Sequence, residues 1–196
     1  MYPGESPLHG PFVDELTGLA NARCLIEDLV EDLEHYGRVG VLLVDLDHFV
    51  GFNDRFGRLA GDQALVAVAR RLVAIAQPAA RPYRLGGDEF VLLHRPTDGR
   101  PDATAFALGV LQALREPFAP CELGAREPEV AGSRVTGTIG ISGARGSTAK
   151  GLLARAGAAL AEAKKCRPEV GDRYVVFDDL PPEQITRFLA EWGEWR

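Results

Sequence analysis

Cysteine and histidine are both scarce in this chain of 196 residues. The three cysteines, Cys24, Cys121 and Cys166, are scattered and form no CxxC pair. The four histidines do not have the spacing of zinc ligands either. An odd and dispersed set of cysteines indicates reduced thiols rather than a disulfide framework, so we expect a cytoplasmic protein.

Long apolar runs and an excess of positive charge are also missing. No apolar stretch approaches the ~18 residues that a membrane-spanning helix needs, and the first residues do not resemble a signal peptide. The net charge is −6, from 22 basic and 28 acidic residues. No overall positive field would therefore attract nucleic acid or anionic lipid. We expect neither nucleic acid binding nor direct membrane insertion, and a nucleotide ligand would need a metal ion or a few placed cations.

The composition that remains is that of one soluble globular domain. Apolar residues make up 46% of the chain and charged residues 26%, close to the average for such domains. Residues 1–13 hold three prolines and two glycines without an apolar period, which predicts a flexible lead-in. We expect residues 14–180 to form the domain and residues 181–196 to add a C-terminal helical extension.

Hydrophobic periodicity predicts alternating helices and strands. The predicted order is a helix capped at Asn21, strand 39–44, helix 65–76, hairpin strands 81–85 and 90–93, helix 102–116, strand 135–142, a helix over 147–165 that Ser147 caps, strand 174–177 and a terminal helix. A short edge strand is expected in the connection over 117–133. This alternation favours an α/β fold with a central mixed sheet flanked by helices.

Carboxylates stand at two turns of this predicted fold. Asp45 ends a buried strand, where open α/β sheets place ligand-binding groups. Asp88 and Glu89 follow Gly86-Gly87 in the hairpin tip, which alone is as consistent with a solvated turn as with a site. On neighbouring strands, however, Asp45 and Asp88 would share one hard cation such as Mg²⁺, and the glycines would let phosphates approach.

The order of these residues resembles the GGDEF domain family, the diguanylate cyclases of bacterial signalling. The similarity runs from about residue 14 to 178, and its matching segments are Asp14–Leu19, Asp45–Phe49, Asn53-Asp54, Gly57, Gly61-Asp62, Arg84–Phe90, Thr136, Ile139-Gly140 and Ala163-Lys164. The resemblance implies a single GGDEF-type domain, similar to the palm of nucleotidyl cyclases. It also implies that two GTP molecules are condensed into cyclic di-GMP with release of pyrophosphate.

The same resemblance implies catalytic roles for the carboxylates. Asp45 and Asp88, with the Leu46 carbonyl, would bind Mg²⁺ or Mn²⁺ carrying the triphosphate of GTP. Glu89 would orient or deprotonate the attacking ribose hydroxyl. Because the product contains two identical halves, the resemblance also implies a homodimer during catalysis. A possible upstream sensor protein is not identified by any feature of the sequence.

Residues that would bind the substrate are implied in the same way. Asn53 and Asp62 would recognise guanine, since a carboxylate accepts hydrogen bonds from the N–H edge of the base and an amide pairs with the other donors and acceptors of the base. Lys164 would lie against the phosphates as a point charge. Taken alone, Asn53 and Asp62 are equally consistent with a turn residue and a helix N-cap, and Lys164 with a solvated helix face. The expected substrate-binding set is completed by Phe49, Gly86 and Gly87.

Several positions depart from the family pattern. Val50 stands where the family has lysine, Gly57 is followed by Arg58 instead of histidine, Gly157 replaces an acidic residue, Ala161 replaces tyrosine, and Cys166-Arg167-Pro168 stands where the family has Gly-Arg-Asn. Either Arg167 or Arg173 would take the place of the arginine that binds phosphate in the family. Two functions remain open: a diguanylate cyclase, or a degenerate module that binds GTP or a protein partner and regulates without turnover.

The segment shortly before the Gly-Gly pair bears on inhibition by the product. Many members of the family carry R-x-x-D shortly before the Gly-Gly pair, and that motif binds the product. The corresponding positions here hold Gln77 and Ala80. Glutamine carries no charge and alanine offers no acceptor, so the sequence predicts that this site is missing.

Overall fold

The computed structural model describes residues 10–36, 39–95, 102–122, 130–143, 148–165 and 173–186. Its strands are β1 (Ala20–Asn21), β2 (Gly40–Leu46), β3 (Ala80–Gly86), β4 (Glu89–His94), β5 (Gly137–Ser142) and β6 (Arg173–Val176). Its helices are α1 (Ala22–Tyr36), α2 (Phe49–Phe56), α3 (Arg58–Ala76), α4 (Ala103–Arg115) and α5 (Ala149–Lys165), with a 3₁₀ turn η2 (Phe177–Asp179). Within these ranges, no helix is both long enough and apolar enough to cross a membrane.

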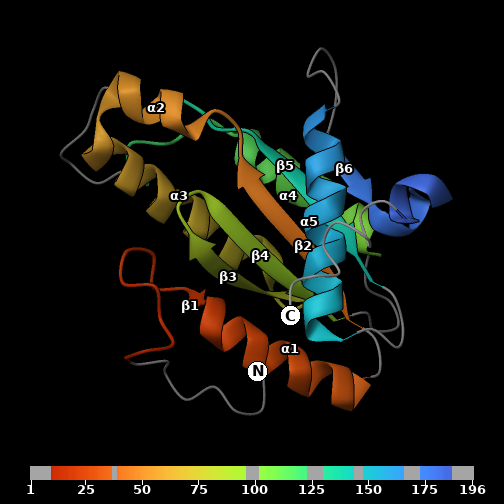
Figure 1. The fold of residues 1–196 in the computed structure, drawn as a ribbon. Helices are drawn as coiled ribbons and strands as arrows, with labels where there is room; N and C mark the ends of the chain where they lie inside the picture. The colour runs from red at the N-terminus through yellow and green to blue at the C-terminus, as the bar shows by residue number, and fades with distance from the viewer. Residues whose placement is uncertain are drawn as a thin grey trace.

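The described strands form one mixed sheet in the order β1-β3-β4-β2-β5-β6 (Figure 1). β2 lies inside the sheet and pairs antiparallel with β4 and β5, whereas β1 with β3 and β5 with β6 are parallel pairs. Helices cover both faces of this sheet (Figure 1). The predicted α/β fold with a central mixed sheet is confirmed.

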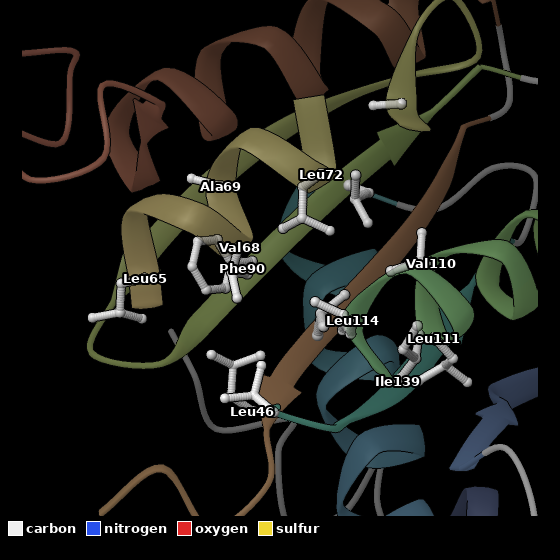
Figure 2. Close-up of a cluster of buried hydrophobic side chains, with 14 of the residues drawn as sticks. Leu46, Leu65, Val68, Ala69, Leu72, Phe90, Val110, Leu111, Leu114 and Ile139 are labelled. Atoms are coloured by element: carbon white, nitrogen blue, oxygen red, sulfur yellow. The ribbon is translucent and has the colours of Figure 1, made fainter. Parts of the chain in front are cut away.

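Side-chain alternation along β2 divides its residues between two hydrophobic clusters. Leu42 and Val44 pack with α3 and α4 on one face, in the cluster that Figure 2 shows in close-up. Leu43 packs with α1 and α5 on the other face. Because successive side chains of a strand point to opposite faces, Asp45 is directed to the face that α5 covers.

The β3–β4 hairpin, predicted from two apolar runs around a Gly-Gly pair, is confirmed. Its tip requires glycine, since Gly86 and Gly87 have φ angles of +141° and +52°. A side chain would be strained in this backbone conformation. The hairpin therefore presents Asp88 on a turn whose shape depends on the two glycines.

Three local features differ from the sequence-based prediction. Residues 49–56, where Gly51 and Gly57 indicate an irregular stretch, form α2. The two-residue strand β1 was not predicted. The edge strand expected within 117–133 does not occur in the described parts of that connection, 117–122 and 130–133.

The helix caps are also defined by the structure. The side chain of Asn21 accepts two backbone N–H groups from the first turn of α1, at 3.0 and 3.2 Å, which confirms this cap. The predicted cap of α5, Ser147, lies outside the described residues. Thr148 acts as a cap there, since its Oγ1 accepts the N–H of Gly151 at 3.1 Å.

The ends of the chain are described only in part. Strand β6 ends at Val176, and Phe177, predicted as part of that strand, begins η2. Residues 182–186 are helical, as predicted for the C-terminal extension. Residues 1–9 and 187–196 lie outside the described residues, so the boundaries of the lead-in and of the extension stay predictions.

Candidate active site

Strand pairing at one end of the sheet brings together carboxylates that are far apart in the sequence. Asp45 of β2 is the register partner of Glu89 of β4. The hairpin turn closes on the same place, since the N–H of Leu46 donates to the carbonyl oxygen of Asp88 at 3.2 Å. The three predicted catalytic residues are therefore neighbours in the fold, and we call Asp45, Asp88 and Glu89 the acidic cluster.

The carboxyl groups of the acidic cluster repel one another. Burial raises the pKa of Asp45, Lys164 opposes this increase, and repulsion from Asp88 adds to it. Burial also raises the pKa of Glu89, and Asp45 and Asp88 raise it further. A cation bound between these groups would relieve this repulsion.

Lys164 supplies a positive charge from the last turn of α5. Its Nζ lies 2.7 Å from Oδ2 of Asp45, and 46% of its side chain is exposed. Lys164 is thus part of the same site as the acidic cluster, and not merely a residue of a solvated helix face. Because the side chain is half exposed, it remains accessible to a phosphate group as well.

The donor set of the acidic cluster fits a Mg²⁺ or Mn²⁺ ion that shares its coordination with a nucleotide. In the described part of the chain, no three His, Cys, Asp or Glu side chains are grouped closely enough to hold a metal ion by themselves. Mg²⁺ typically takes one or two carboxylates and completes its shell with water and phosphate oxygens. The paired carboxylates Asp45 and Asp88 match that requirement.

Asp47, which the sequence placed in a family motif without a role, anchors the end of β2. Its carboxylate is almost fully buried and accepts the hydroxyls of Thr136 and Thr138, both at 2.7 Å. Arg173 of β6 approaches the same carboxylate to 2.5 Å. Arg173 is therefore engaged in holding Asp47, while Arg167, the other candidate for phosphate binding, lies outside the described residues.

Asn53 of α2 contacts Gly61 of α3, the residue that precedes Asp62. A Cβ atom at Gly61 would lie only 1.8 Å from Oδ1 of Asn53, so the amide sits directly over this glycine. Oδ1 of Asn53 is buried and has no hydrogen-bond partner among the described residues. Asn53 lies within α2 and Asp62 within α3, so the alternatives of a turn residue and a helix N-cap are wrong.

The remaining predicted substrate-binding residues lie in different surroundings. Phe49 is buried in the hydrophobic core and stacks on Phe52, with ring centroids 5.6 Å apart. Gly86 and Gly87 are exposed, and a Cβ atom at either would meet nothing within 4 Å. The structure thus leaves open space above the Gly-Gly turn. Phe49, the first residue of α2, instead packs into the hydrophobic core.

Arg84 connects two motifs that the sequence did not link. Its guanidinium is buried, and its Nη1 lies 2.8 Å from Oδ1 of Asp14. Its Nε and Nη2 donate to the carbonyl oxygen of Gly87 at 3.2 and 2.7 Å. Thr17 donates to the same Asp14 oxygen from its N–H and its hydroxyl. The N-terminal motif therefore supports the signature turn through one arginine.

None of the departures from the family pattern replaces a residue of the acidic cluster. Val50, in the first turn of α2, is 71% exposed. Gly157 and Ala161 lie on α5 and are partly exposed. Pro168 lies outside the described residues.

Comparisons with known proteins give the same assignment as the motifs. The family model described as "Diguanylate cyclase, GGDEF domain" matches residues 11–168. The chain is 32% identical over 152 residues to the diguanylate cyclase VdcA of Vibrio cholerae, which covers 77% of this chain and 43% of VdcA. It is 33% identical over 159 residues to the cyclic di-GMP phosphodiesterase NbdA of Pseudomonas aeruginosa, covering 78% of this chain and 19% of NbdA.

The chain thus spans less than half the length of these two curated relatives. A solved structure of TpbB from Pseudomonas aeruginosa, comprising only its GGDEF domain, is similar over a larger share. It is 29% identical with a TM-score of 0.71, covering 91% of this chain and 99% of that one. Since the family model matches most of the sequence and the signature lies on the expected hairpin, this chain belongs to the GGDEF domain family.

Proposed function

We propose that this chain is a diguanylate cyclase, which condenses two GTP molecules into cyclic di-GMP and releases pyrophosphate. The observation that carries the proposal is the acidic cluster, assembled by β2 and the β3–β4 turn beside open space above Gly86 and Gly87. Membership in the GGDEF family and the similarity to VdcA support the same reaction.

Asp45 and Asp88, together with the Leu46 carbonyl, would hold a Mg²⁺ or Mn²⁺ ion. When bound, the ion would neutralise charge on the triphosphate and on the departing pyrophosphate. Lys164, half exposed beside Asp45, would contact the phosphates directly. Gly86 and Gly87 would admit phosphate oxygens close to the backbone, since no side chain fills that space.

Glu89 would accept the proton of the attacking 3′-hydroxyl. Burial and the two neighbouring carboxylates raise its pKa, so its carboxylate is a stronger base than that of an ordinary glutamate. This burial is only partial, and the Glu89 side chain still reaches solvent, which leaves it within reach of a bound nucleotide. The protein's contribution to the reaction would be the alignment of the two nucleotides and this proton acceptor.

Asn53 and Asp62 would recognise the guanine base. Asn53 is only half-buried, and its amide carries donor and acceptor groups that a guanine base can match. Asp62, exposed on the neighbouring helix, would accept from the remaining N–H edge. Adenine presents a different pattern of donors and acceptors, so this pair would favour GTP over ATP.

A degenerate GGDEF module that binds nucleotide without turnover is the second candidate. Three positions favour it: Val50 replaces the family's lysine, Lys164 is paired with Asp45, and Arg173 is paired with Asp47. The described part of the chain therefore offers few uncommitted cations near the acidic cluster. The acidic cluster itself is intact, which favours the enzyme.

Incubation of the purified protein with GTP and Mg²⁺, followed by chromatography, tests the proposal. We expect cyclic di-GMP and pyrophosphate, and a rate at least ~10²-fold lower for Asp88→Ala, which removes one electrostatic stabiliser. Glu31→Ala, which removes an exposed carboxylate of α1, is the matched control and should keep the wild-type rate. GTP binding without product would support the degenerate module, and neither GTP binding nor product would contradict the cyclase and leave only a module that binds a protein partner.

A further inference from the structure

Arg71, in the middle of α3, holds the end of α4 and the segment that follows it. Its Nη1 donates to the carbonyl oxygens of Ala113 and Glu116 at 3.1 and 2.5 Å, and its Nη2 donates to that of Pro117 at 3.0 Å. Its Nε and Nη2 also bind the two carboxylate oxygens of Glu122, each at 2.7 Å. These bonds use the full donor capacity of the guanidinium, so Arg71 fixes residues 116–122 tightly.

The same guanidinium lies over the ring of Phe118. Its Cζ is 4.7 Å from the ring centroid, within the range of a cation–π interaction. Phe118 is buried, and its backbone pairs with Ser133 and Gly132 through hydrogen bonds of 2.8 and 2.9 Å. Arg71 and this backbone pairing together determine where the Phe118 ring lies.

Phe118 also contacts α2, so the place of its ring affects where this helix lies. Its ring meets that of Phe52 edge-on, with centroids 6.5 Å apart. Phe52 also contacts Phe49 and Phe56, at 5.6 and 4.8 Å, so three rings of α2 form one aromatic cluster. Asn53 directly follows Phe52 in the chain.

The placement of α2 needs such support. The helix has only eight residues, and His48 at its N-terminus makes no side-chain cap bond. A helix of this length is not stable without tertiary packing. Asn53 also packs so closely on Gly61 that a Cβ atom there would lie 1.8 Å from its Oδ1, so α2 cannot move nearer to α3 at this point.

We propose that Arg71 is a positioning residue for guanine selectivity. By holding Phe118 against Phe52, it fixes α2 on α3 and keeps the Asn53 amide over Gly61, the neighbour of Asp62 in the chain. Arg71 contacts neither the acidic cluster nor the residues that would bind the base; its effect passes through the aromatic cluster. This inference rests on the proposed function and deepens its base-recognition step.

Calorimetric titration of the full chain with non-hydrolysable GTP and ATP analogues in the presence of Mg²⁺ tests the proposal. Arg71→Met keeps the apolar stem and removes every donor, so we expect affinity for the GTP analogue to fall about tenfold, the effect of one misplaced hydrogen-bonding group. Affinity for the ATP analogue should stay the same, because that ligand does not use the Asn53–Asp62 pair. The matched control is Arg23→Met, which removes an exposed arginine of α1 whose Nε lies 3.9 Å from Oε1 of Glu27, and should behave as wild type.

Phe118→Leu, which keeps apolar volume and removes the ring, should reproduce the loss of selectivity. The Arg71→Met/Phe118→Leu double variant should lose no more selectivity than either single variant, because both act through one path. If Arg71→Met does not fold, the same titrations of Arg71→Lys and Phe118→Leu test the positioning role. Unchanged selectivity, or an equal loss for both analogues, would overturn the positioning role and leave the cyclase proposal intact. Wild-type protein that binds neither analogue would overturn both proposals.

Discussion

Single buried ion pairs connect parts of the chain that carry different motifs. Arg84 binds Asp14, 70 residues earlier in the sequence, and also donates to the Gly87 carbonyl of the hairpin turn. Arg173 joins β6 to Asp47 at the end of β2. Each pair is largely removed from water, so loss of one partner would leave the other charge poorly solvated. The turns that carry the acidic cluster are therefore held by charged side chains that are not part of it.

Replacement of Asp14 with asparagine should lower stability in a pH-dependent way. Burial alone would raise the pKa of Asp14, but hydrogen bonds from Thr17 and Arg84 outweigh it and hold the pKa below its usual value. Such a group stabilises the fold above its unfolded pKa of about 3.9, and this contribution is lost as the pH falls through the lower folded pKa. We expect a loss of about 1–3 kcal/mol at neutral pH, measured by urea unfolding.

The destabilisation by Asp14→Asn should shrink as the pH falls from the unfolded pKa of about 3.9 through the lower folded pKa, because only below the folded pKa does the folded wild-type protein also carry a neutral group at this position. Glu15→Gln, at the exposed neighbouring position, is the control and should have little effect at any pH. A destabilisation by Asp14→Asn of the same size at neutral and at strongly acidic pH would contradict the assignment.

The contacts of Arg81 bear on the predicted absence of a product-inhibition site. Its Nη1 lies 2.6 Å from Asp28, which also accepts the hydroxyl of Tyr83 at 2.6 Å. Arg81 is thus engaged with α1, and Ala80 beside it is buried. Titration of the Asp88→Ala protein with cyclic di-GMP should show no binding in the micromolar range, and binding that Gln77→Ala or Arg81→Ala abolishes would show that the site exists.

Close packing of α5 on the sheet places Lys164 beside Asp45. A Cβ atom at Gly140 of β5 would lie 2.1 Å from the carbonyl oxygen of Ala156 and 2.3 Å from the nitrogen of Leu160. Lys164 follows Leu160 by about one helical turn. The approach of this helix to the sheet therefore depends on a glycine in the strand.

Gly140→Ala should push α5 away from β5. Because the clash is with backbone atoms, we expect a destabilisation of about 1–3 kcal/mol or more in urea unfolding, together with a lower cyclase rate as Lys164 leaves Asp45. The control is Gly143→Ala, at a position where a Cβ atom would meet nothing within 4 Å. Equal stability of the two variants would refute this account of α5 packing.

The helices and strands could be predicted where the sequence has a clear period. The buried run before Asp45 and the two runs around Gly86-Gly87 indicate strands, because apolar residues end there at turn residues. Helix α2 could not be predicted in this way, because it is short and Gly51 and Gly57 suggest irregular structure. Its helical form depends on packing of its aromatic side chains, and single-sequence periodicity does not report such packing.

At the level of the entire domain, the paired carboxylates of the candidate site are predictable from the residues, whereas the guanine-binding residues are predictable only through the family resemblance. The residues alone indicate that Asp45 and Asp88 lie on neighbouring strands, and the sheet pairing agrees. The pairing of Lys164 with Asp45 and the contact of Asn53 with Gly61 arise from how helices pack, which residue spacing does not specify. One such domain carries one acidic cluster, whereas the proposed product contains two GMP units.

Cyclase activity should therefore depend on enzyme concentration. If two domains face each other across a two-fold axis, specific activity should rise with concentration until the dimer is saturated. Activity assays and sedimentation over the same dilution series would test this expectation. Constant specific activity at dilutions where only monomer sediments would contradict the need for a homodimer.

In the proposed complex, Asp45 and Asp88 form one nucleotide and metal site, with the guanine base against Asn53 and Asp62. The most direct test is a crystal structure with a non-hydrolysable GTP analogue and Mn²⁺, whose anomalous signal locates the ion. We predict one manganese peak within coordination distance of both carboxylates, with the base between α2 and α3. A peak that contacts neither carboxylate, or an analogue bound away from the Gly86-Gly87 turn, would contradict the account.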